Sequence, residues 1–290
     1  MIQDLAFGRL ENEFRPLQPY PEATVVCFQG TKSLVSRDEQ GIITLPTYEQ
    51  VCAWAQAGQW EHWNEETVQY VFRLHGQDFF IWMGKAGDCA DPAFNYETVR
   101  DIRQLICKDL CFAVNTAWHL YVWYRDNRFC GRCGVRAVHD DKERMMRCPE
   151  CGNMIFPKIA PAVIIAVTNG DKLLMSKYAG RTPARYALLA GFVEIGETGE
   201  QTVQREVMEE VGLKVKNIRY YKTQPWGIES DLLLGYYCDL DGDDTIRLDE
   251  DELSMAGWYD RHNIPPEAAD DGVSMTREMI RIFAEGKEPR

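Results

Sequence analysis

The first 126 residues combine short strand-like apolar runs with longer helical repeats. The runs ATVVCF and DFFIWMG are continuous, as buried strands are, whereas YEQVCAWAQAGQW has the spacing of a helix. From about residue 95 to residue 126, apolar residues recur at steps of three or four, which predicts one long amphipathic helix. These positions are Val99, Ile102, Ile106, Leu110, Ala113, Ala117 and Tyr121. We therefore predict a small α+β domain over residues 1–126 that ends in this helix.

Two further segments follow this domain. Residues 127–155 are polar, lack apolar periodicity and carry two pairs of cysteines, so they cannot form a core of their own. After Pro157, strand-like runs, a turn at Asn169-Gly170 and two helical stretches alternate along the chain. This order indicates an α/β sandwich. We therefore predict a middle segment over residues 127–155 and a C-terminal domain over residues 156–290.

The bulk composition narrows the possible partners. The chain has 290 residues and a formal net charge of −13, which argues against a broad surface for nucleic acid or anionic membrane. No apolar run approaches the roughly 18 residues that a membrane span needs. The first residues, MIQDLAFGRLENEF, lack the pattern of a signal peptide. We expect a cytoplasmic location and no membrane partner.

Four of the ten cysteines have the spacing of a metal site. Cys130 and Cys133 form one C-x2-C pair, and Cys148 and Cys151 form a second pair after fourteen intervening residues. Two such pairs can enclose one tetrahedral Zn2+ and leave no open coordination position, which favours a structural role. A redox-active pair and a single-iron site with the same ligands are the alternatives.

Three glutamates lie close together in the sequence REVMEEVG. Glu206, Glu209 and Glu210 have the spacing i, i+3 and i+4, so a helix places them on one face, where like charges repel. Thr198 and Gln201 fit a capping box that begins this helix. The apolar positions that would face the core are Val203, Val207 and Val211.

An oxygen-rich helix face after a glycine-rich loop suits a hard cation such as Mg2+ or Mn2+. The alternative is a solvated acidic face, which is the usual meaning of a charge run. A second acidic stretch, residues 239–252, lacks the order of ligands of a calcium loop, and apart from Glu252 we expect its acidic residues to form a solvated turn. His119, on the predicted long helix, reads as a partly exposed histidine without a ligand role.

The full pattern around the glutamates resembles the signature of the Nudix hydrolases. It consists of a glycine, five residues, a glutamate, seven residues and then R-E-apolar-x-E-E-x-G-apolar. The matching residues are Gly191, Glu197, Arg205, Glu206, Val207, Glu209, Glu210, Gly212 and Leu213. The resemblance implies a Nudix α/β/α sandwich that hydrolyses a nucleoside diphosphate linked to another group, with divalent cations held by the glutamates. Arg205 is then expected to orient a neighbouring glutamate.

The order of motifs from about Trp118 to the end resembles the NAD(H) pyrophosphatase family. The cysteine pairs, FPKIAPAVI, the glutamate pattern and TQPW occur in that sequence. The resemblance implies a zinc ribbon in the middle of the chain. It also implies a homodimer that splits the pyrophosphate of NADH or NAD+ into NMN(H) and AMP and, in some members, removes NAD caps from RNA.

The same resemblance implies a set of site residues. The ligands of Mg2+ or Mn2+ would be Glu206, Glu209, Glu210, Glu252 and the carbonyl of Ala190. Phe156 and Phe192 would stack on the nicotinamide end of the substrate, although both are expected in the core without the resemblance. Glu143 and Thr276 match further substrate contacts.

The sequence departs from this family after Gln224, Pro225 and Trp226. The family continues with Pro-Phe-Pro and a serine, whereas this chain continues with Gly227, Ile228, Glu229, Ser230 and Asp231. We expect a more flexible and more acidic loop at this substrate-binding position. A broader ADP-ribose or ADP-sugar pyrophosphatase is therefore an alternative. A non-catalytic nucleotide or RNA sensor is a third hypothesis. The intact set of glutamates argues against it.

Overall fold

The computed structural model describes the chain except for residues 7, 59, 61–66, 90, 103–106, 181 and 290. The chain divides into two compact units. The first, unit 1, contains Met1, Ile159–Trp226 and Asp231–Arg290. The second, unit 2, contains Ile2–Lys158 together with Gly227–Ser230. The turn that departs from the family pattern is therefore part of unit 2.

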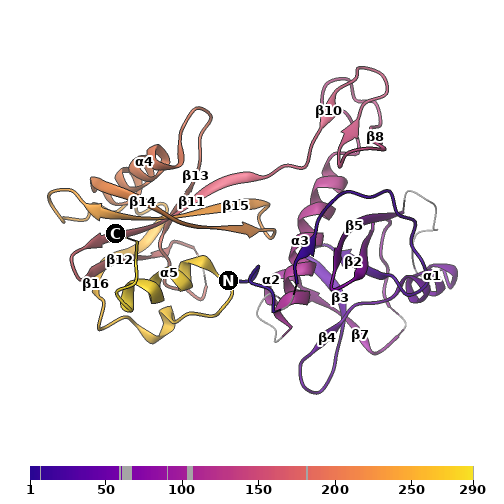
Figure 1. The fold of residues 1–290 in the computed structure, drawn as a ribbon, viewed down its shortest axis with the longest axis horizontal. Helices are drawn as coiled ribbons and strands as arrows, with labels where there is room; N and C mark the ends of the chain where they lie inside the picture. Colours follow the sequence, from indigo (N-terminus) through magenta and orange to yellow (C-terminus); the bar gives the residue numbers. More distant parts are fainter. Residues whose placement is uncertain are drawn as a thin grey trace. The chain divides into compact units, whose positions relative to one another are not determined.

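A seven-stranded sheet forms the centre of the N-terminal part of unit 2 (Figure 1). Its order is β1-β5-β6-β2-β3-β4, and β7 also pairs with β3. The strands are β1 (Leu10–Glu11), β2 (Thr24–Gln29), β3 (Lys32–Arg37), β4 (Ile43–Thr44), β5 (Val68–Leu74), β6 (Gln77–Trp82) and β7 (Phe94–Thr98). Helix α1 (Tyr48–Gln56) begins with a capping box between Thr47 and Gln50, and its Val51 enters the core. The two predicted strands and the predicted helix of this region are confirmed.

The single helix expected from residue 95 to residue 126 is wrong at its N-terminal end. Phe94–Thr98 is strand β7, which pairs along its whole length with β3. Thr98 then begins the short helix α2 (Val99–Ile102), because its Oγ1 accepts a hydrogen bond of 3.1 Å from the N–H of Asp101. Helix α3 (Lys108–Asp126) confirms the C-terminal part, and Ile106 lies outside the described residues. Pairing with a distant strand outweighs the local helical period here.

The middle segment is a small three-stranded sheet built from β8 (Val138–His139), β9 (Met146–Arg147) and β10 (Met154–Ile155). Gly134 and Gly152 follow the second cysteine of each pair and have φ values of 75° and 69°. Other residues rarely adopt this left-handed conformation, so glycine suits both turns. The predicted ribbon is thus made of two similar turns joined by short strands.

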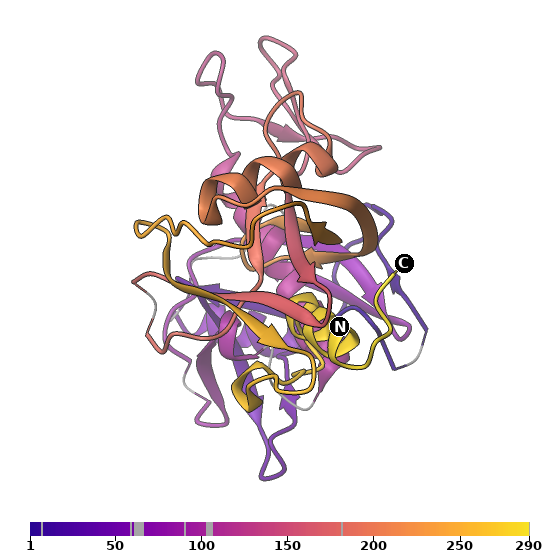
Figure 2. The same ribbon diagram turned by 90° about the vertical axis from the view of Figure 1, so that its left-hand side faces the viewer.

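Unit 1 is the predicted α/β/α sandwich. Its six-stranded sheet has the order β14-β15-β11-β12-β16, and β13 pairs with β11. The strands are β11 (Ala160–Asn169), β12 (Lys172–Tyr178), β13 (Leu189–Phe192), β14 (Val215–Trp226), β15 (Asp231–Leu240) and β16 (Leu253–Asp260). Helices α4 (Gly199–Val211) and α5 (Met275–Ala284) cover opposite faces of the sheet (Figures 1 and 2). A 3-10 turn, η1 (Pro266–Ala268), precedes α5.

Each helix covers the sheet with one apolar stripe. The predicted stripe of α4, Val203, Val207 and Val211, is fully buried in one core cluster. Met275, Met279 and Phe283 of α5 are buried in a second cluster on the opposite face. The capping box of Thr198 and Gln201 begins α4, as the sequence predicts. Within the described residues, no helix is both long and apolar enough to span a membrane.

A buried carboxylate ties α5 to the sheet. The side chain of Glu278 is 8% exposed, and its Oε1 accepts hydrogen bonds from Tyr221 Oη at 2.7 Å and Lys222 Nζ at 2.6 Å. Burial alone would raise the pKa of Glu278, but Lys222 and Tyr221 outweigh it and lower this pKa to about 2. The ionised form of Glu278 is therefore stabilised by folding.

Replacing Glu278 by Gln keeps the shape of the side chain and removes its charge. Because folding lowers this pKa, the stabilising contribution is present above pH 4.5 and is lost as the pH falls toward 2. We expect Glu278→Gln to lower the free energy of unfolding by about 1–3 kcal/mol at pH 7, and by less at pH 3. Urea unfolding at both pH values measures this, with the exposed Glu267→Gln as control. An equal deficit at both pH values would contradict the assignment.

Candidate active site and zinc centre

The structure brings all four predicted zinc cysteines together. Their Sγ atoms lie within 4.8 Å of one another, and this is the only such group of metal-ligating side chains among the described residues. Cys130 and Cys133 lie 3.6 Å from Cys151, and Cys133 lies 3.4 Å from Cys148. Zn–S bonds of roughly 2.3 Å place tetrahedral sulfurs about 3.8 Å apart, so the four thiols fit one Zn2+.

Main-chain N–H groups stabilise thiolates at this centre. The N–H of Arg132 donates to Cys130 Sγ at 3.4 Å, and the N–H of Cys151 donates to Cys148 Sγ at 3.5 Å. The first of these bonds is the main reason that the pKa of Cys130 falls to about 6. A thiolate is the form that binds a metal. The geometry therefore favours a closed structural site over a disulfide, and all ten cysteines are free thiols.

Arg205 is the centre of the glutamate segment. Its Nε and Nη2 donate to the two carboxylate oxygens of Glu197 at 2.8 and 2.9 Å. Its Nη1 donates to Glu206 at 2.6 Å and to Glu209 at 2.9 Å, and its Nη2 also donates to the carbonyl of Phe192. The hydrogen bonds from Arg205 lower the pKa of Glu197 to about 2. One guanidinium thus holds three carboxylates and the loop that precedes α4.

Glu210 lies outside this network. It is 1% exposed, and both of its carboxylate oxygens are buried without a hydrogen-bond partner. Burial raises the pKa of Glu210 to about 8, with smaller contributions from the charges of Glu206 and Glu252, while the main chain of Ala190 opposes the rise. A buried carboxylate without a partner is costly unless a cation completes its environment.

Glycine at position 191 makes room for this arrangement. A Cβ atom on Gly191 would overlap the carboxylate of Glu206, so the observed position of that carboxylate requires glycine. Burial raises the pKa of Glu206, and the charge of Glu252, in the turn before β16, contributes to the rise. The charges of Glu206 and Glu252 also contribute to the raised pKa of Glu210, so these carboxylates influence one another.

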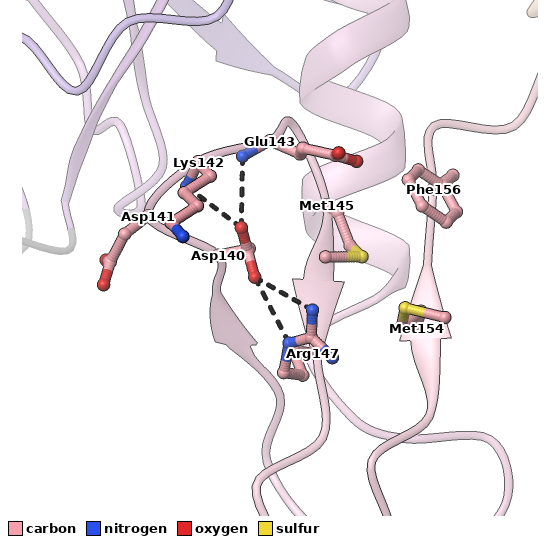
Figure 3. Close-up of a pocket in the computed structure, with 8 residues that line it drawn as sticks. All are labelled: Asp140, Asp141, Lys142, Glu143, Met145, Arg147, Met154 and Phe156. Carbon is pink, nitrogen blue, oxygen red and sulfur yellow. Dashed lines mark hydrogen bonds and ion pairs between the residues drawn. The ribbon is translucent and has the colours of Figure 1, made fainter.

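Two other predicted residues, Glu143 and Phe156, line a cavity of about 450 Å3 in unit 2 (Figure 3). Figure 3 shows the Glu143 side chain extending from its loop toward the segment that carries Phe156. Asp140 orders this loop, because its Oδ1 accepts hydrogen bonds from the N–H groups of Lys142 and Glu143. Both Phe156 and Phe192 are more than half exposed, at 53% and 56%, so the alternative that they belong to the core is wrong.

The turn after Trp226 is held more firmly than its composition suggests. A Cβ atom on Gly227 would overlap the carbonyl oxygen of Asn115 in α3, and Trp118 Nε1 donates to the carbonyl of Ile228 at 3.3 Å. Arg100 of α2 forms an ion pair with Glu229. Three contacts with helices of unit 2 therefore hold this turn, and its greater flexibility stays a prediction.

The remaining predicted residues lie in unit 1, on β14, β15 and α5. Gln224 is fully buried, its Nε2 donates to the carbonyl of Val273 at 2.9 Å, and its Oε1 accepts from the N–H of Met275 at 2.8 Å. Thr276 lies in the first turn of α5, and Asp231 is buried at the start of β15. Gln224 thus holds the helix that carries Thr276, with both ends of its amide already hydrogen-bonded. Pro225 and Trp226 end strand β14.

The sequence-based predictions missed several residues of these sites. Met145 and Met154 line the cavity of Figure 3, and Asp140 and Arg147 form an ion pair at its wall. No motif marks them, although all four lie within twelve residues of a metal cysteine. His119 donates from Nε2 to the carbonyl of Lys158 at 2.7 Å, because a carbonyl can only accept. His119 is partly exposed, as predicted, but its place in the sequence did not indicate this hydrogen bond.

Removal of one zinc ligand should unfold the ribbon, because this segment has no core of its own. We expect Cys148→Ser to lose the bound zinc and to lower the melting temperature. Cys107→Ser, a change at a cysteine outside the cluster, should keep the zinc content and the melting temperature of the wild type. Metal analysis by mass spectrometry and calorimetry measure the two quantities. Full zinc occupancy in Cys148→Ser would contradict the proposed ligand set.

The free carboxylate of Glu210 should make stability depend on pH when no divalent cation is added. The pKa is about 8 in the folded state and 4.5 ordinarily, so the folded chain binds an extra proton and loses stability as the pH rises from 4.5 to 8. We therefore expect Glu210→Gln to be more stable than wild type at pH 8.5 and nearly equal at pH 4.5. Urea unfolding measures this. Added Mg2+ should raise the free energy of unfolding of the wild type at pH 8.5 and leave that of Glu210→Gln unchanged. An equal rise in both proteins would contradict a cation site at Glu210.

Comparison with known proteins identifies two domain families in the chain. Residues 158–279 match the NUDIX domain, and residues 125–156 match the NADH pyrophosphatase zinc ribbon domain. In the solved structures, a NUDIX hydrolase from Nitrosomonas europaea aligns with 55% of this chain and 91% of its own, at a TM-score of 0.47 and 23% identity. The predicted resemblance to the Nudix hydrolases is thus confirmed by the domain match.

Curated relatives extend this match toward the N-terminus. The NAD-capped RNA hydrolase NudC of Enterobacter sp. (strain 638) is 42% identical over 218 residues, which cover 73% of this chain and 82% of the relative. The protein of the same name from Pseudomonas aeruginosa is 40% identical over 162 residues, and that match covers 56% of this chain and 57% of the relative. The chain therefore belongs to the NudC family of Nudix proteins, with the zinc ribbon of the NADH pyrophosphatases.

Proposed function

We propose that this protein hydrolyses the pyrophosphate bond of NADH and NAD+ to NMN(H) and AMP, and that it removes NAD caps from RNA. The observation that carries the proposal is the buried carboxylate of Glu210, which has no hydrogen-bond partner and lies beside Glu206 on α4. The zinc ribbon in the same chain and the relatives called NAD-capped RNA hydrolases support this choice of substrate.

Glu206, Glu209, Glu210, Glu252 and the carbonyl of Ala190 would hold Mg2+ or Mn2+. When bound, the cation neutralises bridging phosphate oxygens and makes an attacking water more acidic. Arg205 keeps the carboxylates of Glu206 and Glu209 oriented by hydrogen bonds at 2.6 and 2.9 Å. We place the acceptor of the water's proton at Glu210, whose buried carboxylate has no hydrogen-bond partner.

Phe156 and Phe192 supply exposed aromatic faces for the nicotinamide end of the substrate. Glu143 shares a cavity with Phe156 and adds a negative charge that suits the positive ring of NAD+. Gln224, Pro225, Trp226, Thr276 and the turn Gly227–Asp231 complete the proposed substrate-binding set. Of these, Gln224 acts by holding the start of α5.

We also propose a cytoplasmic homodimer. Ten free thiols, four of them clustered for zinc, suit a reducing compartment. The ribbon carries exposed apolar side chains, which support burial against a second copy. They are Phe129, Val135 and Val138.

A broader ADP-ribose or ADP-sugar pyrophosphatase is the second candidate. The observation that favours it is the turn Gly227–Ser230, whose sequence differs from the expected proline-rich turn and which packs on α3. A single reaction that offers NADH, NAD+, ADP-ribose and NAD-capped RNA together ranks these candidates. Higher kcat/KM on ADP-ribose than on the dinucleotides would favour the second candidate.

Glu210→Gln should lower kcat for NADH by a factor of about 10^3 or more, because the neutral amide neither holds the cation nor accepts the proton. The products AMP and NMNH are separated by chromatography in the presence of Mn2+. Glu200→Gln, a change in the first turn of the same helix, is the matched control and should leave kcat unchanged. Equal kcat values for Glu210→Gln and wild type would contradict the proposed role of Glu210.

A further inference from the structure

We propose that one face of α3, formed by Asn115, Trp118 and His119, is a positioning surface for substrate binding. It holds the main chain at two places where the chain passes from one compact unit to the other, after Lys158 and at Gly227–Ser230. Spacings of i, i+3 and i+4 put these three residues on one side of the helix. The inference rests on the proposed function, which takes Phe156 and the Gly227–Ser230 turn as substrate-binding.

The first anchor is the hydrogen bond from His119 Nε2 to the carbonyl of Lys158, at 2.7 Å. Burial lowers the pKa of His119, so the ring is neutral at pH 7 and carries its proton on Nε2. Lys158 lies two residues after Phe156, which lines the cavity of Figure 3. The bond therefore limits the movement of the segment that presents Phe156 to that cavity.

The second anchor is a close approach between two main chains. Gly227 lies so near the carbonyl oxygen of Asn115 that a Cβ atom would overlap it, and the same atom would touch Cβ of His119 at 3.4 Å. Trp118 lies beside this contact and donates from Nε1 to the carbonyl of Ile228. Since Trp118 is 7% exposed and its ring packs on Phe28 at 5.2 Å, its indole N–H is itself held in place.

The two anchors share one helix face, so a single rigid element fixes both segments. Asn115 is 5% exposed, and its side-chain amide donates to the carbonyl of Cys111, which keeps it within α3. The ion pair of Arg100 with Glu229 adds a third hold on the turn, from α2. None of these residues belongs to the glutamate site, so their loss should weaken substrate binding and leave the chemical step intact.

The test compares His119→Phe, His119→Gln and Gly227→Ala with wild type in full-length, zinc-loaded protein. His119→Phe keeps a ring and removes the donor, whereas His119→Gln keeps a side-chain N–H at a similar reach. We expect KM for NADH to rise about fivefold in His119→Phe and Gly227→Ala, with kcat within about twofold of wild type. His119→Gln should recover most of the loss.

Gly257→Ala is the matched glycine control, because a Cβ there meets only Tyr259 at 3.6 Å, an ordinary contact. Its KM should equal that of wild type. The proposal would be overturned by an unchanged KM in both His119→Phe and Gly227→Ala, or by a fall in kcat at constant KM. Either result would count even if the melting temperature of these variants falls.

Hydrogen exchange separates this proposal from the proposed function. Main-chain exchange at Lys158, at Ile159 and at residues 227–231 should be about fivefold faster in His119→Phe and Gly227→Ala than in wild type, whether or not the protein hydrolyses NADH. If the wild-type protein does not hydrolyse NADH, the proposed function is wrong. The two anchors are then tested by hydrogen exchange alone. Unchanged exchange in both segments would refute them.

Discussion

The guanidinium of Arg205 is the interaction on which the glutamate site depends. Without it, Glu206 and Glu209 would repel each other on one helix face, and the carboxylate of Glu197 would keep only the hydrogen bond from Thr202 Oγ1 as its tie to α4. Arg205 also donates to the carbonyl of Phe192, so the same group fixes the end of β13 and the loop that leads to the helix. The exposed ring of Phe192 is therefore positioned by the residue that orients the carboxylates.

The two metal centres differ in how far the chain itself completes them. Four thiols already lie within 4.8 Å of one another, with main-chain N–H groups directed at two sulfurs, so the zinc centre is part of the fold. In the glutamate site, Arg205 holds the carboxylates of Glu197, Glu206 and Glu209, while Glu210 stays buried and without a hydrogen-bond partner. The first arrangement suits a permanent ion and the second suits an ion that arrives with a polyphosphate.

Local patterns allowed the sequence to predict much of this structure. The capping box at Thr198, the valine stripe of α4 and the cysteine spacing each depend on residues a few positions apart. Features that depend on distant partners were missed. Strand β7 exists because β3 pairs with it, and the amide of Gln224 is used by the start of α5, some fifty residues later.

The turn after Trp226 shows why a departure from a family motif needs a structure to interpret it. Glycine in place of proline suggests a gain in flexibility when only the turn is considered. In the structure, a Cβ atom at position 227 would overlap the carbonyl of Asn115, so proline or alanine there would displace the turn from α3. Glycine here permits close packing, and a change of substrate preference is therefore to be sought in how this turn rests on α3.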